Sequence, residues 1–323
     1  MANEIIREPI EEFGLSKKGK AVTLFSKIGI IGCGLVGQNL SRVASYYGLE
    51  VVFIEVTEEK VAEAFDGITK MMDHRIQHWG LTESEKRANL SRIQGSTDFN
   101  MLRGCDFVVE AIRAVDRGTK IRERKEIFKK VESVVDRECI IATNSSTVII
   151  TELASELEYK DRCISIHFFV NSPEARIVEV MKGLYTSEET YNKVCKFVKL
   201  INRVVVPVEE SAGLISIRIF VVCLNEACEL LMEGVASMED IDLVMRVGYG
   251  MRQGPFEVAD RMGLDKVIRW MENIYSEFGD VRYKPSPYIK KLVRAKHLGV
   301  VTSQGFYAYD ENGVKIPLKS RVC

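Results

Sequence analysis

His167 and Glu179 are the two residues whose types and spacing point most directly to acid–base chemistry. His167 directly follows the strand-like run at 163–166, at the edge where an α/β sheet presents ligand-binding side chains. Glu179 follows 12 residues later in the apolar stretch 177–180, where an unpaired carboxylate would be costly to bury. A carboxylate paired with an imidazole fixes the ring's tautomer and stabilises its protonated form. The pair predicts a general base, although a solvated histidine and a surface glutamate fit these two residues alone equally well.

A glycine-rich motif lies near the start of the chain, after the apolar run 27–31. It consists of Gly32, Cys33, Gly34, Leu35, Val36 and Gly37. In a GxGxxG sequence the first glycine permits a tight turn, the second lets the backbone approach a pyrophosphate, and the third allows helix and strand to pack closely. Amides at the start of the following helix then face the phosphate oxygens. The motif predicts a dinucleotide site, against the alternative of a glycine turn without a ligand.

Glu55 indicates which dinucleotide binds, because it stands 18 residues beyond Gly37, at the end of the next expected strand. A carboxylate at that place accepts hydrogen bonds from the adenosine ribose and repels a 2′-phosphate, which favours NAD over NADP. FAD is bound by the same fingerprint, but nothing later in the chain supports a flavin.

The elements that must position these residues follow from the apolar pattern. Strands are expected at 27–31, 50–54, 106–109, 139–142, 163–166, 177–180 and 204–208, and helices at 34–47, 56–79 and 84–91. Strands alternating with helices predict a parallel sheet covered on both faces. After residue 208 the pattern is helical, with an apolar helix at 214–232 and further helices at 238–247, 255–262 and 265–277. We therefore expect an α/β fold, a Rossmann-type dinucleotide-binding domain followed by an all-helical C-terminal domain. The expected boundaries are 1–26 for an N-terminal extension, 27–208 for the NAD-binding domain and 209–323 for the helical domain.

The charge composition argues against nucleic-acid binding. The 323 residues contain 45 Lys and Arg against 46 Asp and Glu, a formal charge of −1. That balance argues against a basic surface spread over the molecule, and the basic run at 113–125 is interrupted by acids, as in a solvated helix. We expect no nucleic-acid partner.

The eight cysteines form no CxxC pair, which favours reduced thiols over a disulfide framework or a zinc site. His74 and His78 share a helical face, but without a third ligand they predict a solvated surface and no metal. The first residues lack the apolar core of a signal peptide, and no run of ~18 apolar residues could span a membrane. We expect a cytoplasmic protein without a membrane partner.

Several motifs in order carry a resemblance to a known family. They are IGCGLVGQNL, DFVVEAI, TNSST, HFF with IVEV, SAGLISIR, and the stretch from EGVASMED to ADRMGLD. The chain resembles the L-3-hydroxyacyl-CoA dehydrogenase family, including short-chain 3-hydroxybutyryl-CoA dehydrogenases, over about residues 27–309. The resemblance implies reversible hydride transfer between NAD and the 3-carbon of an acyl-CoA substrate.

The resemblance also assigns roles to residues. It makes His167 the base, Glu179 its partner and Ser146 the contact to the substrate hydroxyl. It places Glu110 and the glycine loop at the cofactor, and Lys70 and Asn171 at the substrate, with Lys70 near a CoA phosphate. The family also implies a homodimer, which the apolar helix at 214–232 favours.

The sequence departs from the family pattern at identifiable positions. Ile217 and Val170 occupy places where the family has substrate-contacting Asn residues, and about five extra residues lie within 113–125. An isoleucine has no hydrogen-bonding group, so a substrate contact is lost. Two alternatives therefore stay open: a dehydrogenase of a free 3-hydroxy acid, similar to the gulonate-dehydrogenase branch, and a catalytically impaired NAD-binding paralogue.

Overall fold

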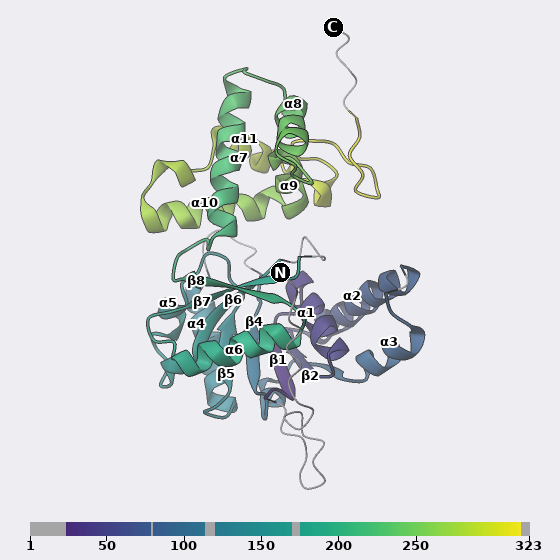
Figure 1. Ribbon diagram of the computed structural model, residues 1–323, viewed down its shortest axis with the longest axis vertical. Coiled ribbons are helices and arrows are strands. Elements are labelled where there is room, and N and C mark those ends of the chain that lie inside the picture. Colours follow the sequence, from purple (N-terminus) through teal and green to yellow (C-terminus); the bar gives the residue numbers. More distant parts are fainter. Residues whose placement is uncertain (1–23, 79, 114–119, 170–174, 318–323) are drawn as a thin grey trace, which may run out of the picture.

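The chain folds into a sheet domain and a helical domain (Figure 1). The structure is a computed structural model that describes residues 24–78, 80–113, 120–169 and 175–317. The sheet domain contains the N-terminal part of the described chain, and the helical domain sits beyond the end of the sheet where β8 leads into α7 (Figure 1). The two domains meet where the strands point their carboxyl ends, so a site there can draw on both.

The described residues of the first domain form an eight-stranded sheet in the order β3-β2-β1-β4-β5-β6-β7-β8. The strands are β1 (Lys27–Ile31), β2 (Glu50–Ile54), β3 (Ile93–Ser96), β4 (Phe107–Glu110), β5 (Ile140–Thr143), β6 (Cys163–Phe168), β7 (Ile177–Lys182) and β8 (Val204–Glu209). The order reverses between β1 and β4, the place where open α/β sheets bind ligands.

The expectation of a wholly parallel sheet is wrong at one pair of strands. β6 and β7 are antiparallel, whereas the other neighbouring strands are parallel. A parallel pair needs a crossover of about a dozen residues or more. Only residues 169–176 connect β6 to β7, so β7 returns alongside β6. This reversal places the second half of the predicted acid–base pair directly opposite the first.

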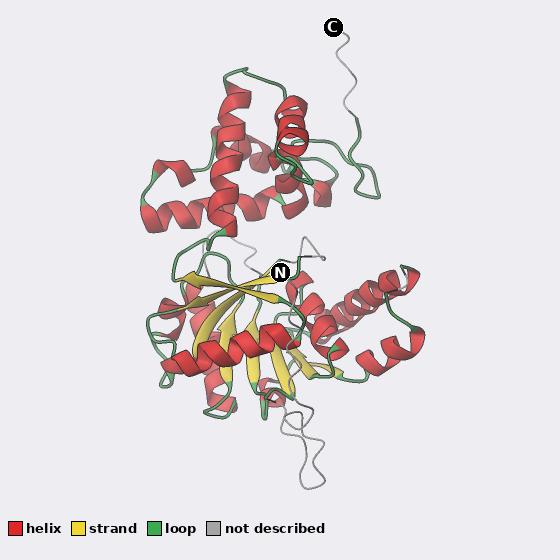
Figure 2. Cartoon of the chain, viewed as in Figure 1, coloured by secondary structure: helices red, strands yellow, loops and turns green. Residues whose placement is uncertain are grey.

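Helices cover both faces of the sheet (Figure 2). They are α1 (Leu35–Tyr46), α2 (Glu58–Gln77), α3 (Glu83–Leu90), α4 (Ile121–Val134), α5 (Ile150–Ala154) and α6 (Glu188–Leu200). The apolar residues of α1, α2 and α6 pack with one set of strand side chains, and those of α4 and α5 with the alternate set. Because successive strand residues point to opposite faces, both faces of each central strand are apolar.

The second domain is built around a separate apolar core. Its helices are α7 (Ser216–Met232), α8 (Met238–Leu243), α9 (Pro255–Met262), α10 (Leu264–Phe278) and α11 (Pro287–Arg294). The helix expected at 238–247 ends earlier than predicted, because a π-helical turn follows it at Val244–Gly248.

None of the helices in the described ranges combines the length and the apolar composition that a membrane span requires.

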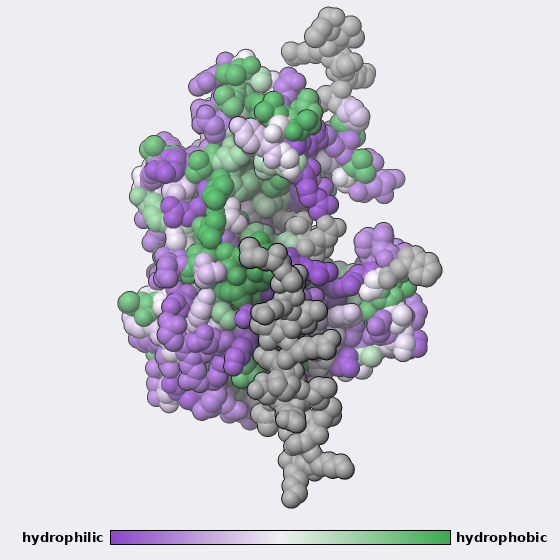
Figure 3. Space-filling view, viewed as in Figure 1, coloured by the Kyte–Doolittle hydropathy of each residue, from purple (hydrophilic) through white to green (hydrophobic). Residues whose placement is uncertain are grey.

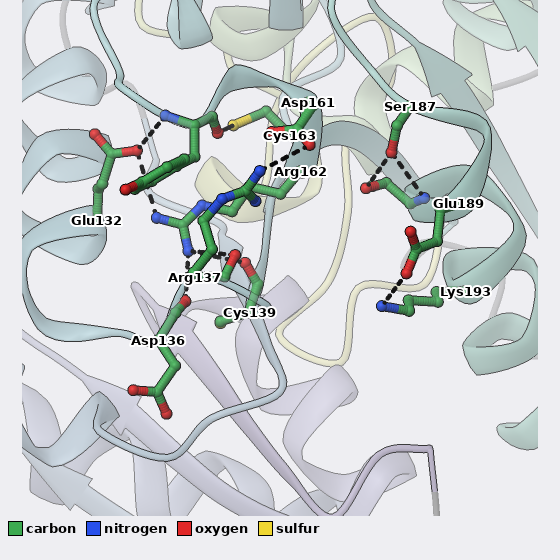
Figure 4. Close-up of polar contacts among 12 residues, drawn as sticks. Glu132, Asp136, Arg137, Cys139, Asp161, Arg162, Cys163, Ser187, Glu189 and Lys193 are labelled. Atoms are coloured by element: carbon green, nitrogen blue, oxygen red, sulfur yellow. Dashed lines mark hydrogen bonds and ion pairs between the residues drawn. The ribbon is translucent and has the colours of Figure 1, made fainter.

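A buried arginine fixes the start of the strand that carries His167. Arg162 Nη1 donates to the carbonyl oxygens of Asp136 at 2.5 Å and Cys139 at 3.3 Å, which lie just before β5 (Figure 4). Glu132 on α4 forms an ion pair with the same guanidinium at 3.4 Å. The Arg162 guanidinium thus ties the start of β6 to the segment before β5 and to α4. The predicted site lies at the opposite ends of β5 and β6.

Candidate active site

The glycine loop between β1 and α1 has the packing that its motif requires. Gly32 has a φ of +85°, and a Cβ there would lie 3.0 Å from the backbone of Ile112. A Cβ on Gly37 would lie 2.4 Å from the carbonyl oxygen of Gly32. A Cβ on Gly34 would meet nothing within 4 Å, and Gly34 lines the cavity described below. Gly32 and Gly37 therefore close the loop tightly, while the backbone of Gly34 stays open to a ligand. This arrangement fits the pyrophosphate of a dinucleotide.

Glu55 lies beside this loop at the carboxyl end of β2. Its Oε1 accepts a hydrogen bond from the amide of Cys33 at 2.5 Å, which fixes the carboxylate next to the motif. An acid in this position fits the ribose contact of NAD.

Glu110, at the end of β4, is enclosed by protein groups and is only 1% exposed. Its carboxylate forms an ion pair with Arg124 and accepts hydrogen bonds from Thr143 Oγ1 and the amide of Ile112, each at 2.7 Å. Arg124 and Ile112 line the cavity, whereas Glu110 does not. Its direct contact with the cofactor stays a prediction, and the geometry favours a carboxylate that positions Arg124 and the 110–112 turn.

His167 and Glu179 are cross-strand partners in the antiparallel β6–β7 pair. His167 Nδ1 lies 2.8 Å from Glu179 Oε2, and the two side chains are buried. A carboxylate can only accept, so Nδ1 carries a proton, and in the neutral imidazole the lone pair is then on Nε2. Nε2 is therefore the atom able to accept a proton in the cavity.

Glu179 is also held by the first turn of α7. Its Oε1 accepts from the amides of Ile215 at 3.1 Å and Ser216 at 3.0 Å, and Ser216 Oγ donates to Oε2 at 2.8 Å. Burial alone would raise the pKa of Glu179, but the hydrogen bonds from His167 and Ser216 outweigh it and lower that pKa below its usual value. The residue is thus a stable carboxylate that joins the sheet domain to the helical domain.

Ser146 brings a hydroxyl to the free side of the imidazole. Its Oγ lies 3.1 Å from His167 Nε2, and its carbonyl accepts from the amide of Gly213 at 3.0 Å. The neighbouring Asn144 accepts from the amide of Phe168 at 3.1 Å, which ties the loop after β5 to the end of β6. A substrate hydroxyl placed here can contact Ser146 and His167 together.

These groups open into a cavity of about 350 Å³ between the two domains. The sheet domain contributes Gly34 to Val36, Ala111 to Arg113, Asn144 to Val148, and His167. The helical domain contributes residues of α9 and α10, including Lys266, Arg269, Trp270 and Asn273. The cavity joins the glycine loop to the histidine, as a site for a dinucleotide and a second reactant requires.

Other predicted residues lie elsewhere. Lys70 is exposed on α2 and is not among the cavity-lining residues, so its contact with CoA stays a prediction. Asn171 and Val170 lie outside the described residues, as do residues 1–23 of the expected extension and 114–119 of the expected insertion. Ile217 is 3% exposed and packs in the core of the helical domain, so its side chain stabilises that domain.

The sequence interpretation missed residues contributed by the helical domain. Ser216 completes the environment of Glu179, and Lys266, Arg269 and Asn273 form a wall of the cavity. Residues 266, 269, 270 and 273 recur with the spacing of one helical face, a signal that was present in the sequence. The sequence spacing does not show what this face contacts, because that depends on how the two domains pack against each other.

Comparison with known proteins identifies the family. Residues 27–211 match the family model for the 3-hydroxyacyl-CoA dehydrogenase NAD-binding domain, and residues 213–309 match that for the C-terminal domain. The chain belongs to the 3-hydroxyacyl-CoA dehydrogenase family. It is accordingly an enzyme with the dehydrogenase activity of this family and an NAD-binding domain.

Individual relatives match over nearly their whole length. The 3-hydroxybutyryl-CoA dehydrogenase of Clostridioides difficile is 33% identical over 88% of this chain and 100% of its own. The mitochondrial hydroxyacyl-coenzyme A dehydrogenase of Homo sapiens is 33% identical over 87% of this chain and 90% of its own. The crystal structure of (S)-3-hydroxybutyryl-CoA dehydrogenase from Ralstonia eutropha superposes with a TM-score of 0.82 at 33% identity, covering 89% of this chain and 100% of that one. The similarity therefore extends across both domains.

Proposed function

We propose that this member of the family interconverts short-chain L-3-hydroxyacyl-CoA and 3-oxoacyl-CoA, with His167 as the general base. The observation that carries this proposal is the connected set Ser146–His167–Glu179 at the cavity, with 3.1 and 2.8 Å between successive polar atoms. The named activity of the 3-hydroxybutyryl-CoA dehydrogenases that the chain resembles supports a short acyl chain.

The residues act on a single proton. Ser146 and His167 hold the 3-hydroxyl, and Nε2 removes its proton as the carbonyl forms. Glu179 stabilises the resulting imidazolium and keeps the ring oriented. In the other direction the imidazolium returns the proton to the forming alkoxide.

The cofactor site supplies the second half of the reaction. NAD held at this site would supply the acceptor for the hydride of the 3-carbon, and NADH would supply the hydride in the reverse direction. We assign its pyrophosphate to Gly32, Gly34, Leu35, Val36 and Gly37, and its ribose to Glu55. Lys70 and Asn171 remain proposed contacts of the acyl-CoA.

A product analysis tests the proposal. Purified protein is incubated with NADH and acetoacetyl-CoA, and L-3-hydroxybutyryl-CoA is quantified against NADH consumed. We expect one product molecule for each NADH oxidised, and weaker use of NADPH because of Glu55. Turnover of acetoacetate without the thioester would instead support the free-acid alternative. NADH binding without reduction of either compound would support a catalytically impaired protein and contradict the proposal.

We also propose a homodimer formed through the helical domain. Apolar side chains are exposed on α7 and around the π-helical turn; those of Ile219, Val235, Val247 and Tyr249 are 63–77% exposed. Apolar residues gather over this part of the helical domain (Figure 3). Apolar side chains that gather on an exposed surface often mark a protein–protein interface. Sedimentation equilibrium at micromolar concentration should give twice the chain mass of 36.6 kDa.

We propose a cytoplasmic location as well, because the seven described cysteines are all free thiols. Reducing compartments keep cysteines in that state. Some relatives carry a mitochondrial name, so cell fractionation distinguishes the two compartments.

A further inference from the structure

The loop after β5 carries three consecutive hydroxyl side chains, and each of them has a different hydrogen-bond partner. Ser145 Oγ accepts from a backbone amide of the same loop at 3.2 Å, which closes the turn. Ser146 Oγ lies 3.1 Å from His167 Nε2. Thr147 Oγ1 accepts at 2.9 Å from Asn273 Nδ2 on α10, 126 residues further along the chain. The third bond therefore joins the loop that carries the substrate-hydroxyl contact to the helical domain.

α10 supports the same loop at a second, adjacent point. The carbonyl of Ser146 accepts from the amide of Gly213 at 3.0 Å. Gly213 has a φ of +85°, and a Cβ there would lie 2.6 Å from Cδ1 of Ile274, so the Ile274 side chain packs directly on this glycine. Two consecutive residues of α10 thus support the loop, Asn273 through the side chain of Thr147 and Ile274 through the residue that holds the Ser146 carbonyl.

The burial of α10 makes it a firm support. Trp270, Met271 and Ile274 are buried in the apolar core of the helical domain. Asn273 is half-buried beside them and lines the cavity. A half-buried amide loses part of its contact with water, and the bond to Thr147 satisfies one of its donors. The hydrogen bond is therefore fixed at one end by a helix that a closely packed core holds in place.

The sheet domain alone fixes only the first half of this loop. Asn144 accepts from the amide of Phe168 at 3.1 Å, and Ser145 closes the turn. The carbonyl of Ser146 and the side chain of Thr147 are held by residues beyond the sheet. Reacting groups need to be held within about 0.5 Å of their productive positions, and a displacement of ~1 Å can lower a rate ~100-fold. The position of the Ser146 hydroxyl therefore depends on the helical domain.

We propose that Asn273 is a positioning residue of the dehydrogenase reaction, which through Thr147 holds the Ser146 hydroxyl in place beside His167. Packing of the helical domain against the sheet domain then completes the catalytic set. This inference rests on the proposed function and adds a residue to it. Asn273 acts through the loop and not by contact with the substrate, so its loss should lower kcat and leave the affinity for NADH unchanged.

Two double-mutant cycles test the proposal. Asn273→Leu and Thr147→Val remove the two polar partners with little change in volume, alone and together, and Asn273→Leu is also combined with Ser146→Ala. Asn225→Leu on α7 is the matched control, because Asn225 Nδ2 donates to two carbonyl oxygens within the helical domain, at 2.8 and 2.9 Å. For each variant we measure kcat and KM for acetoacetyl-CoA, the Kd of NADH and the unfolding temperature.

We expect kcat to fall ~10-fold in Asn273→Leu and in Thr147→Val, and no further when the two are combined, because both remove the same bond. Thr147→Ser keeps the hydroxyl and should recover most of the loss. In the Ser146→Ala background Asn273→Leu should lower kcat less than about twofold, because no hydroxyl remains to be positioned. Asn225→Leu should keep the kcat of the wild type even where its unfolding temperature falls.

Three results would overturn the proposal while leaving the dehydrogenase function intact: the full loss from Asn273→Leu in the Ser146→Ala background, a wild-type kcat in Thr147→Val, or the same loss of kcat in Asn225→Leu. If the wild type reduces no 3-oxoacyl-CoA, the proposed function fails, and hydrogen exchange of the NADH complex still decides on the contact. The amides of residues 144–148 should exchange faster in Asn273→Leu than in the wild type or in Asn225→Leu. Equal exchange in all three proteins would overturn the positioning role.

Discussion

Glu179 and Asp260 are both buried carboxylates, 2% and 1% exposed, yet their surroundings give them opposite properties. Glu179 meets His167, which can become positive, and its pKa is lowered. Asp260, on α9, accepts from the amides of Phe306 and Tyr307 at 2.9 Å and from the hydroxyl of Tyr309 at 3.0 Å. Burial raises the pKa of Asp260 to about 6 despite these bonds.

The difference shows what a buried acid needs in order to take part in proton transfer. Neutral donors satisfy the oxygens of Asp260 and hold residues 306–309 against α9, but they leave the cost of burying its charge largely uncompensated. Glu179 gains an ionisable partner that connects it to the cavity. We therefore expect replacements of Glu179 to affect catalysis first, and replacements of Asp260 to affect stability first.

Among replacements of these two carboxylates, Glu179→Gln is expected to have the largest effect on catalysis. An amide cannot stabilise the imidazolium of His167, so kcat for acetoacetyl-CoA reduction should fall ~100- to 1,000-fold. The unfolding midpoint in urea should change far less than kcat. A Glu179→Gln enzyme with kcat within threefold of wild type would show that the carboxylate is structural, like Asp260.

Asp260→Asn should produce the reverse pattern. The amide nitrogen of asparagine would face N–H or O–H donors, so the free energy of unfolding should fall by about 2 kcal/mol while kcat of the folded enzyme changes little. Urea unfolding followed by circular dichroism measures the first quantity. A large loss of kcat in an equally stable variant would contradict the assignment of Asp260 to structure.

The contribution of Asp260 to stability should depend on pH, and its raised pKa fixes the direction of that change. The folded-state pKa of Asp260, about 6, lies above the usual aspartate value of 3.8. Between these values the folded chain binds more protons than the unfolded chain, so the contribution of Asp260 to stability falls as the pH rises through this window. The difference in unfolding free energy between wild type and Asp260→Asn should shrink by about 2 kcal/mol from pH 4 to pH 7. A difference that grows over this range would contradict the raised pKa.

The smallest effect concerns Ser216, which donates to Glu179 from the other domain. Ser216→Ala removes one of several donors to the carboxylate, and kcat should fall only ~3- to 10-fold. Ser216→Thr keeps the hydroxyl and should recover most of the loss. If both variants lose activity equally, the residue acts through packing at the start of α7.

Local motifs made much of the site predictable from sequence. The glycine loop and Glu55 belong to one strand–helix–strand unit, so their spacing alone indicated their proximity. The pairing of His167 with Glu179 was also predictable as chemistry, but the antiparallel register that creates it depends on the short 169–176 connection.

Contacts between domains were not predictable in this way. Ser216 and Lys266 lie 37 and 87 residues beyond Glu179, and nothing local shows that α7 and α10 meet the sheet at its carboxyl edge. Ile217 illustrates the same limit, because the motif marks it as a lost substrate contact while tertiary packing makes it a core residue. Periodicity indicates which residues share a face, and docking of the domains decides what that face contacts.

In the proposed reaction, His167 gives the proton to the 3-oxygen of the substrate in this cavity while a hydride reaches the 3-carbon. A single-turnover experiment with NADH carrying deuterium at both C4 positions tests it most directly, with acetoacetyl-CoA as substrate and His167→Gln as the matched variant. The wild type should place one deuterium at C3 of the product for each NADH oxidised. The variant should still bind NADH, seen by its fluorescence, and transfer deuterium ~100- to 10,000-fold more slowly. Transfer at the same rate in both proteins would contradict the role of His167, and NADH binding without transfer in the wild type would contradict the claim as a whole.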